Sequence, residues 1–289
     1  MKKLSRALFA VLFLGIAGSA WAEELNDRLS ESNQAIVRER EQKIKEEIAQ
    51  LKDHPWAGQY YYGYAGGAGA FLTLAPNNGF TIIGYDHGNL TYLEHGMVDW
   101  DGTYIKLSYT FDLKGGSIDD EAVKRKPIRW GERVYLIPTY RIIEFCNEIN
   151  SGWEPRNYRS GRFYLRQDDW EKEAPGKPEL PEELMPYLLD EPVEATIVSV
   201  KKTWEANRDW NIATVVVDKG KNDGFLPGME LYVVKPVVSG TKVKLTKVEE
   251  TQSVGELNYS RPRDDSLFSR LFGTPAPAKG WQLSTSWKR

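Results

Sequence analysis

The residues most able to do chemistry gather in one short stretch, YDHGNLTYLEHG, which holds Asp86, His87, Glu94 and His95. Imidazoles beside carboxylates could ligate zinc or act as a general acid and base. Each of these histidines precedes a glycine, however, which predicts that both stand in solvated turns. No third ligand follows at a metal-like spacing. We favour the turn interpretation and predict neither a metal nor a cofactor, and the alternative is a metal-dependent or acid/base hydrolase.

A second candidate is the aromatic, glycine-rich stretch QYYYGYAGGAGA. In a strand, Tyr60, Tyr62 and Tyr64 share one face and Tyr61 lies on the other. The three tyrosines either pack a core, which we favour, or line an apolar pocket. The glycines do not form a P-loop, because no Lys-Ser or Lys-Thr follows them. They do not form a dinucleotide fingerprint either, because the strand-like FLTL comes next instead of a helix. We expect a flexible hairpin connection.

A third candidate is VDKGKNDGFLPGMELYVV, near the C-terminus. A calcium loop starting at Asp218 would need glycine at its sixth position and glutamate at its twelfth, and both are missing. The stretch instead has the composition of tight turns between two apolar strands. We predict that Gly220, Asp223, Gly224 and Gly228 shape those turns.

Residues 23–53 form a charged segment that contains neither Gly nor Pro. Its apolar residues recur at helical spacing, which predicts a long amphipathic helix. The apolar stripe can dock on the helix's own domain, which we favour, or pair with a second copy of the chain. The stripe consists of Leu25, Leu29, Ile36, Ile44, Ile48 and Leu51.

Residues 54–168 switch to alternating apolar and polar positions and predict a β-sandwich or barrel with one short helix, YRIIEFCNEINSG. Two hairpins are expected, FLTLA-PNNG-FTIIGY and MVDW-DG-TYIKLSYTF. A two-residue Asp-Gly loop in the second would pair Trp100 with Thr103 and Val98 with Ile105.

A proline-rich acidic stretch, residues 169–192, predicts a linker with at most a short helix after Pro181. Beyond it, residues 193–289 hold about six short strand patterns, which predict a small β-barrel. The sequence of the long loop at 261–279 does not predict a function for it. The fold class is therefore mainly β, with two β-domains that follow the helix.

The first 22 residues carry a basic start, an apolar run and an Ala-Trp-Ala site. This order predicts a signal peptide cleaved near Ala22 and a periplasmic or secreted protein. No later apolar run could span a membrane. The formal net charge of −3 and the lack of a basic cluster argue against nucleic acid as a partner. The single cysteine, Cys146, lies among apolar residues and is expected to pack as a small hydrophobe.

Three resemblances add expectations about the class of protein. The start W-x-G-x-Y (Trp56, Gly58, Tyr60) resembles the first strand of lipocalin-type ligand-binding barrels. The turn-rich stretch after Asp218, where Asp replaces the usual Asn, resembles β-barrel modules of bacterial envelope proteins of the LysM-associated, FlgT or MreC type. The patterns W-G-x-R-x-Y-L (130–136) and E-F-C-N (144–147) resemble a family of uncharacterised secreted Gram-negative proteins.

Together these features predict a non-enzymatic binding or assembly protein of the cell envelope. Its expected partner is another envelope protein or peptidoglycan, and the 23–53 helix could also mediate self-association. The alternative is a lipocalin-like carrier of a small apolar ligand in the first β-domain. A hydrolase built on the acid–histidine stretch is the third hypothesis.

Overall fold

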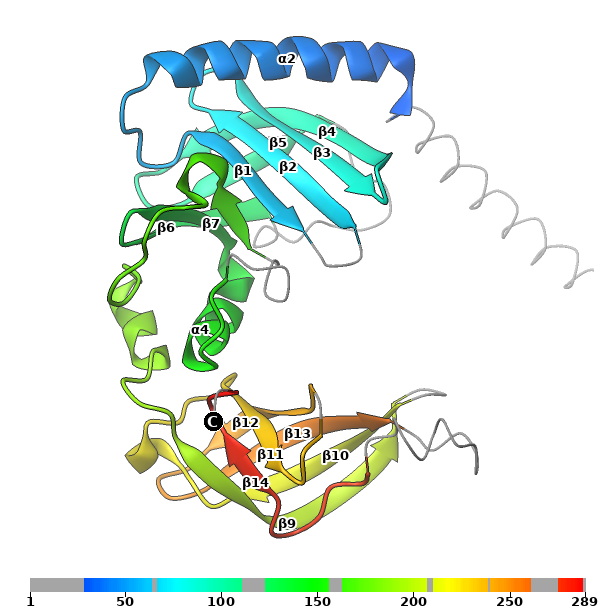
Figure 1. Ribbon diagram of the computed structural model, residues 1–289, viewed down its shortest axis with the longest axis vertical. Coiled ribbons are helices and arrows are strands. Elements are labelled where there is room, and N and C mark those ends of the chain that lie inside the picture. Colours follow the sequence, from blue (N-terminus) through cyan, green and yellow to red (C-terminus); the bar gives the residue numbers. More distant parts are fainter. Residues whose placement is uncertain are drawn as a thin grey trace, which may run out of the picture. The chain divides into compact units, whose positions relative to one another are not determined.

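The computed structural model describes residues 29–63, 67–110, 123–155, 163–206, 210–238, 240–260 and 275–287. The predicted signal peptide, residues 23–28 of the predicted helix, Tyr64 and most of the 261–279 loop lie outside these ranges. The fold is mainly β, as predicted, and contains two closed barrels (Figure 1). Two compact units divide the chain. Unit 1 comprises Met1–Thr139 and Arg156–Pro178, and unit 2 comprises Tyr140–Pro155 and Glu179–Arg289.

The first barrel is an eight-stranded antiparallel meander in which each strand pairs with the next. The last strand pairs antiparallel with the first, so the sheet has no free edge. Its strands are β1 (Gly58–Gly63), β2 (Ala68–Ala75), β3 (Gly79–Asp86), β4 (Asn89–Trp100), β5 (Ile105–Tyr109), β6 (Lys124–Trp130), β7 (Arg133–Pro138) and β8 (Tyr164–Arg166).

Strand alternation sorts the side chains of this barrel into an inner and an outer set. Tyr60, Leu72 and Ile82 stand opposite one another on β1, β2 and β3 and belong to the buried core. Their neighbours Tyr61 and Phe71 therefore point outward. The lumen is thus lined by apolar and aromatic residues, and the outer face carries a second aromatic row.

The hairpin between β4 and β5 has a longer loop than the sequence predicts. Trp100 pairs with Ile105 instead of Thr103. The reason is a local one, because the Asp101 carboxylate accepts hydrogen bonds from the backbone N–H groups of Thr103 (2.8 Å) and Tyr104 (2.7 Å). This Asx-type turn holds two more residues in the loop. The register moves by two positions, so the predicted faces are retained.

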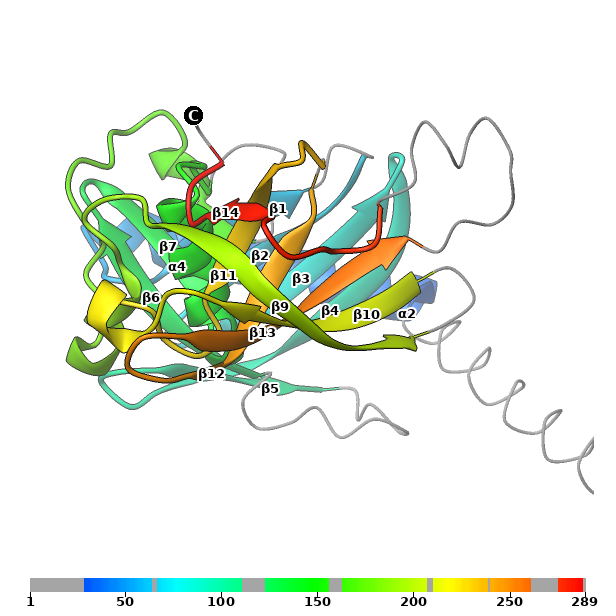
Figure 2. The ribbon, with the colours of Figure 1, turned by 90° about the horizontal axis from the view of Figure 1, so that it is seen from below.

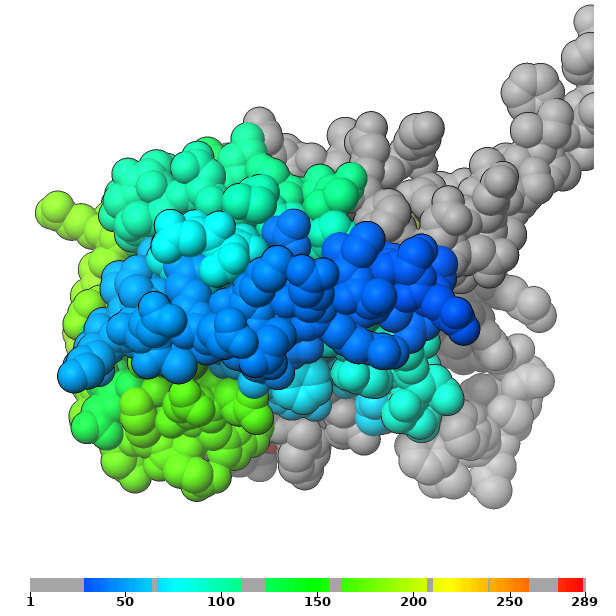
Figure 3. Space-filling model, turned by 90° about the horizontal axis from the view of Figure 1, so that it is seen from above, coloured from blue at the N-terminus to red at the C-terminus, as the bar shows by residue number. Residues whose placement is uncertain are grey.

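Of the predicted 23–53 helix, the described part contains helix α2 (Glu31–Gln50), which ends three residues before Asp53. It begins where it does because the Ser30 hydroxyl caps it, accepting from the Asn33 N–H at 3.2 Å. The helix lies over β2, β3 and β4 (Figure 3). Its Val37 and Ile44 side chains are buried. It therefore docks on its own barrel. Among the described residues, no helix has both the length and the apolar character that crossing a membrane requires.

The second barrel closes in the order β10-β13-β12-β11-β14-β9, with every pairing antiparallel (Figure 2). Its core contains Phe225, Met229 and Leu231, all at most 1% exposed. The six strands confirm the predicted small barrel. They are β9 (Glu194–Glu205), β10 (Trp210–Val217), β11 (Glu230–Lys235), β12 (Lys242–Val248), β13 (Ser253–Ser260) and β14 (Gln282–Ser284).

The short helix α4 (Ile142–Asn150) packs in unit 2, although the sequence analysis places it in the first β-domain. The Asn147 side chain donates to the Gly228 carbonyl (3.0 Å) and accepts from the Glu230 N–H (3.2 Å). Lys242 lies 2.8 Å from Glu230 and 3.7 Å from Glu148 of the helix. These partners lie about eighty residues along the chain, so the local pattern around the helix could not reveal them.

The predicted linker at 169–192 is anchored along much of its length instead of running free. On the first barrel, the Trp130 indole donates to the Gly176 carbonyl at 2.8 Å and Arg133 Nε donates to the Lys172 carbonyl at 2.6 Å. In unit 2, the Asn150 amide donates to the Tyr187 carbonyl at 2.8 Å. The short helix predicted after Pro181 is the 3-10 helix η3 (Glu182–Tyr187).

Candidate functional site

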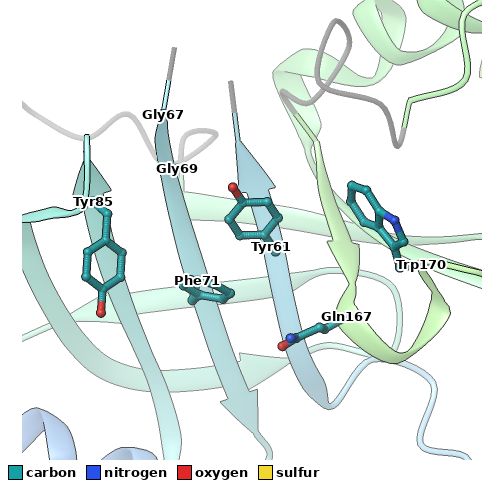
Figure 4. A pocket seen from close by; sticks show the side chains of 8 residues that line it. Tyr61, Gly67, Gly69, Phe71, Tyr85, Gln167 and Trp170 are labelled. Carbon is teal, nitrogen blue, oxygen red and sulfur yellow. The ribbon is translucent and has the colours of Figure 1, made fainter. Parts of the chain in front are cut away.

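The outer face of the first barrel carries a hollow of about 600 Å³ beside strands β1, β2 and β3. Its side chains are aromatic or neutral: Tyr61, Phe71, Tyr85, Gln167 and Trp170 (Figure 4). The remaining lining residues that the structure describes are glycines, so no described residue of the lining is charged.

Register and glycine spacing explain how three of the rings stand together. Tyr61 lies opposite Phe71 in the β1–β2 pair, and their ring centroids are 4.9 Å apart. Tyr85 on β3 meets the Phe71 ring at 6.2 Å in a T-shaped arrangement. A Cβ placed on Gly63 would lie 2.1 Å from the Tyr61 oxygen, and one on Gly69 would lie 2.9 Å from it. Glycine at these two positions lets the Tyr61 ring lie against the sheet.

Gln167 and Trp170 come from the segment that follows β8, where the 3-10 helix η2 (Gln167–Asp169) is held by one buried carboxylate. Asp169 is 0% exposed. It accepts from Arg166 Nε at 2.8 Å, from the Val134 N–H at 2.9 Å and from Lys172 Nζ at 2.6 Å. This anchor fixes the turn that presents Trp170 to the hollow beyond Tyr61 (Figure 4).

The rim of the hollow is formed by a two-residue turn between β3 and β4. His87 (φ 48°) and Gly88 (φ 80°) both have positive φ, as a type I′ hairpin turn requires. The His87 N–H donates to the Gly67 carbonyl at 3.1 Å, and its Nδ1 lies 2.8 Å from Asp86 Oδ1. The turn position predicted for His87 is therefore found, and Gly88 itself lines the hollow.

The structure does not bring the four predicted acid and histidine residues together. Glu94 stands opposite the core residue Ile82 and faces the lumen, whereas His95, the next residue on β4, faces outward. Asp86 and His87, both exposed, pair with each other. In the described ranges, no group of three or more His, Cys, Asp or Glu side chains could hold a metal ion.

The turn predicted at His95 is wrong, because this residue lies in the middle of β4 and is 4% exposed. Its Nδ1 lies 3.1 Å from the Thr110 hydroxyl. Burial, reinforced by the positive charge of Arg40 on helix α2, lowers the pKa of His95 below its ordinary value. The neutral imidazole therefore belongs to the packing between α2 and the barrel.

Two of the three tyrosines predicted to share a face do so. Tyr60 is fully buried in the lumen and donates its hydroxyl to the Trp56 carbonyl at 2.8 Å. Tyr62 meets the ring of Tyr164, another core residue, at 4.7 Å. Burial raises the pKa of Tyr60 well above its usual range. Both side chains thus pack in the barrel interior.

The predicted turn residues of the second barrel have the geometry that the sequence suggests. Gly224 and Gly228 have φ of 85° and 91°. Asp223 accepts from the Gly220 N–H at 3.0 Å and closes the turn. A Cβ on Gly220 would lie 2.3 Å from the Glu249 carbonyl oxygen, so this position requires glycine for space.

The sequence analysis does not identify the hollow. Part of the hollow could have been predicted from the sequence. Tyr61 and Phe71 are aromatic residues at outward positions, and nearby glycines leave room for their rings. Trp170 has no such signal, since it lies in the stretch interpreted as a linker and reaches the sheet only through the buried Asp169. Comparisons with protein-family models, curated proteins and solved structures found no match to this chain.

Proposed function

We propose that this protein is a non-enzymatic binding protein of the cell envelope and that its outer aromatic hollow binds the sugar rings of a glycan, such as a peptidoglycan strand. The observation that supports this is the uncharged aromatic lining. Tyrosine and tryptophan offer an apolar ring face with a polar edge. A sugar ring has the matching chemistry, with apolar C–H faces and hydroxyl groups around its rim.

Charge and exposure favour a glycan over other ligands. The described lining of the hollow contains no cation, and the chain is acidic, which disfavours nucleic acid and other polyanions. Trp170 and Tyr85 are 39% and 36% exposed, so the site presents large rings to solvent. An extended glycan strand that crosses the surface can stack its sugar rings on these side chains. A small apolar ligand would cover less of them and leave the rings exposed to solvent. The periplasmic compartment predicted from the first residues contains such strands.

The proposal is tested by titrating soluble peptidoglycan glycan fragments into the purified protein and measuring binding by calorimetry. Tyr61→Ala and Trp170→Ala should each weaken binding at least ~10-fold, because aromatic contacts of this kind dominate binding energies. Trp210→Ala removes a similarly exposed tryptophan (46%, against 39% for Trp170) from the second barrel and is the matched control. Binding that is absent, or that survives both substitutions, would refute the proposal.

The carrier of a small apolar ligand remains the second candidate. Its support is the closed eight-stranded barrel, since a barrel of this size has an interior just wide enough for side chains or one small ligand. The support for the hydrolase hypothesis is the Asp86–His87 pair at the solvent-exposed rim.

A further inference from the structure

Inside the first barrel, strand β6 places an arginine among the core side chains. Arg125 pairs with the core residue Ile105 across the β5–β6 ladder, so the two share the lumen face. Its guanidinium carbon lies 5.6 Å from the ring centroid of Tyr164, another core residue. The side chain is 7% exposed.

Two nitrogens of this guanidinium, Nε and Nη1, are buried and have no hydrogen-bond partner among the residues that the structure describes. A buried cation without an acceptor is costly, and proteins normally pair such groups. The chain follows that rule elsewhere. Arg166 donates to Asp169 at 2.8 Å, and Arg133, 1% exposed, donates to the Lys172 carbonyl at 2.6 Å. Arg125 differs from both.

The surroundings of Arg125 are suited to an oxygen-rich partner. Tyr164, which lies against Arg125, meets the ring of Tyr62 at 4.7 Å, and Tyr92 and Tyr109 pack against the same core. Burial keeps the pKa of Tyr92 and of Tyr164 well above the usual range, so both hydroxyls stay protonated and able to donate. Glu94 also faces the lumen near Tyr92, and its like charge would oppose an acid group placed beside it. The apolar remainder of the lumen includes Leu72, Ile82, Leu107 and Leu136.

We propose that the lumen of the first barrel binds a small amphipathic organic acid, whose carboxylate lies against Arg125 and whose carbon chain lies among the apolar core residues. A carboxylate supplies the missing acceptors and also neutralises the buried charge, whereas a water molecule supplies acceptors alone. This site lies inside the barrel wall, and the aromatic hollow lies outside it. The two sites therefore make independent predictions, and the acid gives the carrier hypothesis a ligand class.

The test compares thermal unfolding of the full chain with decanoate and with decanol, each below its aggregation concentration. The two probes share an alkyl chain and differ in the acid group. At about ten times its dissociation constant, decanoate should raise the melting temperature by about 5 °C, as ligand linkage predicts for a unit of this size. Decanol should give less than a quarter of that shift. Inorganic phosphate is a third arm that separates a need for any anion from a need for the alkyl acid.

Three variants assign the effect to the guanidinium. Arg125→Met should abolish the decanoate shift, and Arg125→Lys, which keeps the charge, should retain part of it. Arg129→Met is the matched control, because Arg129 lies on the same strand with an exposed side chain and should respond like the wild type. Tyr61→Ala, which would impair the outer hollow, should leave the decanoate response intact and so separates this proposal from glycan binding.

Several outcomes would overturn the proposal. The first is a wild type that responds equally to decanoate and decanol, or to neither. The second is a wild type that responds to phosphate as strongly as to decanoate, which would indicate a simple anion site. The third is an Arg125→Met protein that keeps the full decanoate shift. If Arg125→Met does not fold, the wild-type probe pair and Arg125→Lys still decide the question.

Discussion

Replacing Glu47 should weaken the docking of helix α2 on the barrel beneath it. The Glu47 carboxylate accepts four hydrogen bonds from the turn between β2 and β3. Oε1 accepts from the backbone N–H (3.0 Å) and the side-chain amide (2.7 Å) of Asn77, and Oε2 accepts from the corresponding groups of Asn78 (3.0 and 2.8 Å). One side chain thus ties the helix to a turn thirty residues away.

The expected magnitude follows from the exposure of these bonds. The two to Asn77 are exposed and contribute little, whereas the two to Asn78 are partly buried. At about 1 kcal/mol for each partly buried bond, Glu47→Ala should lower the free energy of unfolding by about 2 kcal/mol. Glu47→Gln keeps one acceptor oxygen and should cost about half as much. Glu46→Ala is the control, because exposed Glu46 accepts only from Gln42, at 2.8 Å, and the same helix-propensity change applies.

The effect should also depend on pH. Burial acts to raise the pKa of Glu47, but the hydrogen bonds from Asn77 and Asn78 outweigh it and hold the pKa below the ordinary 4.5. The stabilisation is therefore present above pH 4.5 and is lost as the pH falls through the lower pKa of the folded state. Urea unfolding at pH 7 and at pH 3 measures both effects. A Glu47→Ala protein within ~0.5 kcal/mol of the Glu46→Ala protein at pH 7, or a deficit unchanged at pH 3, would refute the reasoning.

Three further predictions concern other parts of the chain. Because the pKa values of His95 and His54 are lowered below 6.5, mainly by burial, stability should be complete above pH 6.5 and fall as the pH drops below it. His95→Gln should reduce the change in melting temperature between about pH 7.5 and 5.5. A melting temperature that varies with pH as steeply as in the wild type would count against this assignment. Gly224→Val and Gly228→Val should each cost more than about 1 kcal/mol in chemical unfolding, since both glycines have positive φ; wild-type stability of both variants would contradict this. Burial raises the pKa of Cys146 to about 12, so a thiol reagent at pH 8 should modify the folded protein at least ~100-fold more slowly than the unfolded chain. Rapid labelling of the folded state would show that the thiol is accessible.

Local periodicity and turn chemistry determine most of the secondary structure of this protein. Alternation in QYYYGY is enough to separate Tyr61 from Tyr60 and Tyr62, because successive side chains of a strand must point to opposite faces. Glycine after aspartate or proline marks the positive-φ turns at Gly224 and Gly228. Strand alternation and turn geometry depend on neighbouring residues alone, so both can be predicted from the sequence.

Tertiary structure decides which distant groups meet. The sequence around His95 resembles that around His87, yet one lies under helix α2 and the other in an exposed turn, because the register of β4 places them. The sequence around helix α4 predicts that the helix belongs to the first domain. In the structure it packs in unit 2, where Asn147 binds backbone groups of Gly228 and Glu230. Trp170 reaches the aromatic hollow only because the buried carboxylate of Asp169 holds its turn. Each outcome depends on burial and hydrogen bonds between residues far apart in the chain, and no local pattern specifies such contacts.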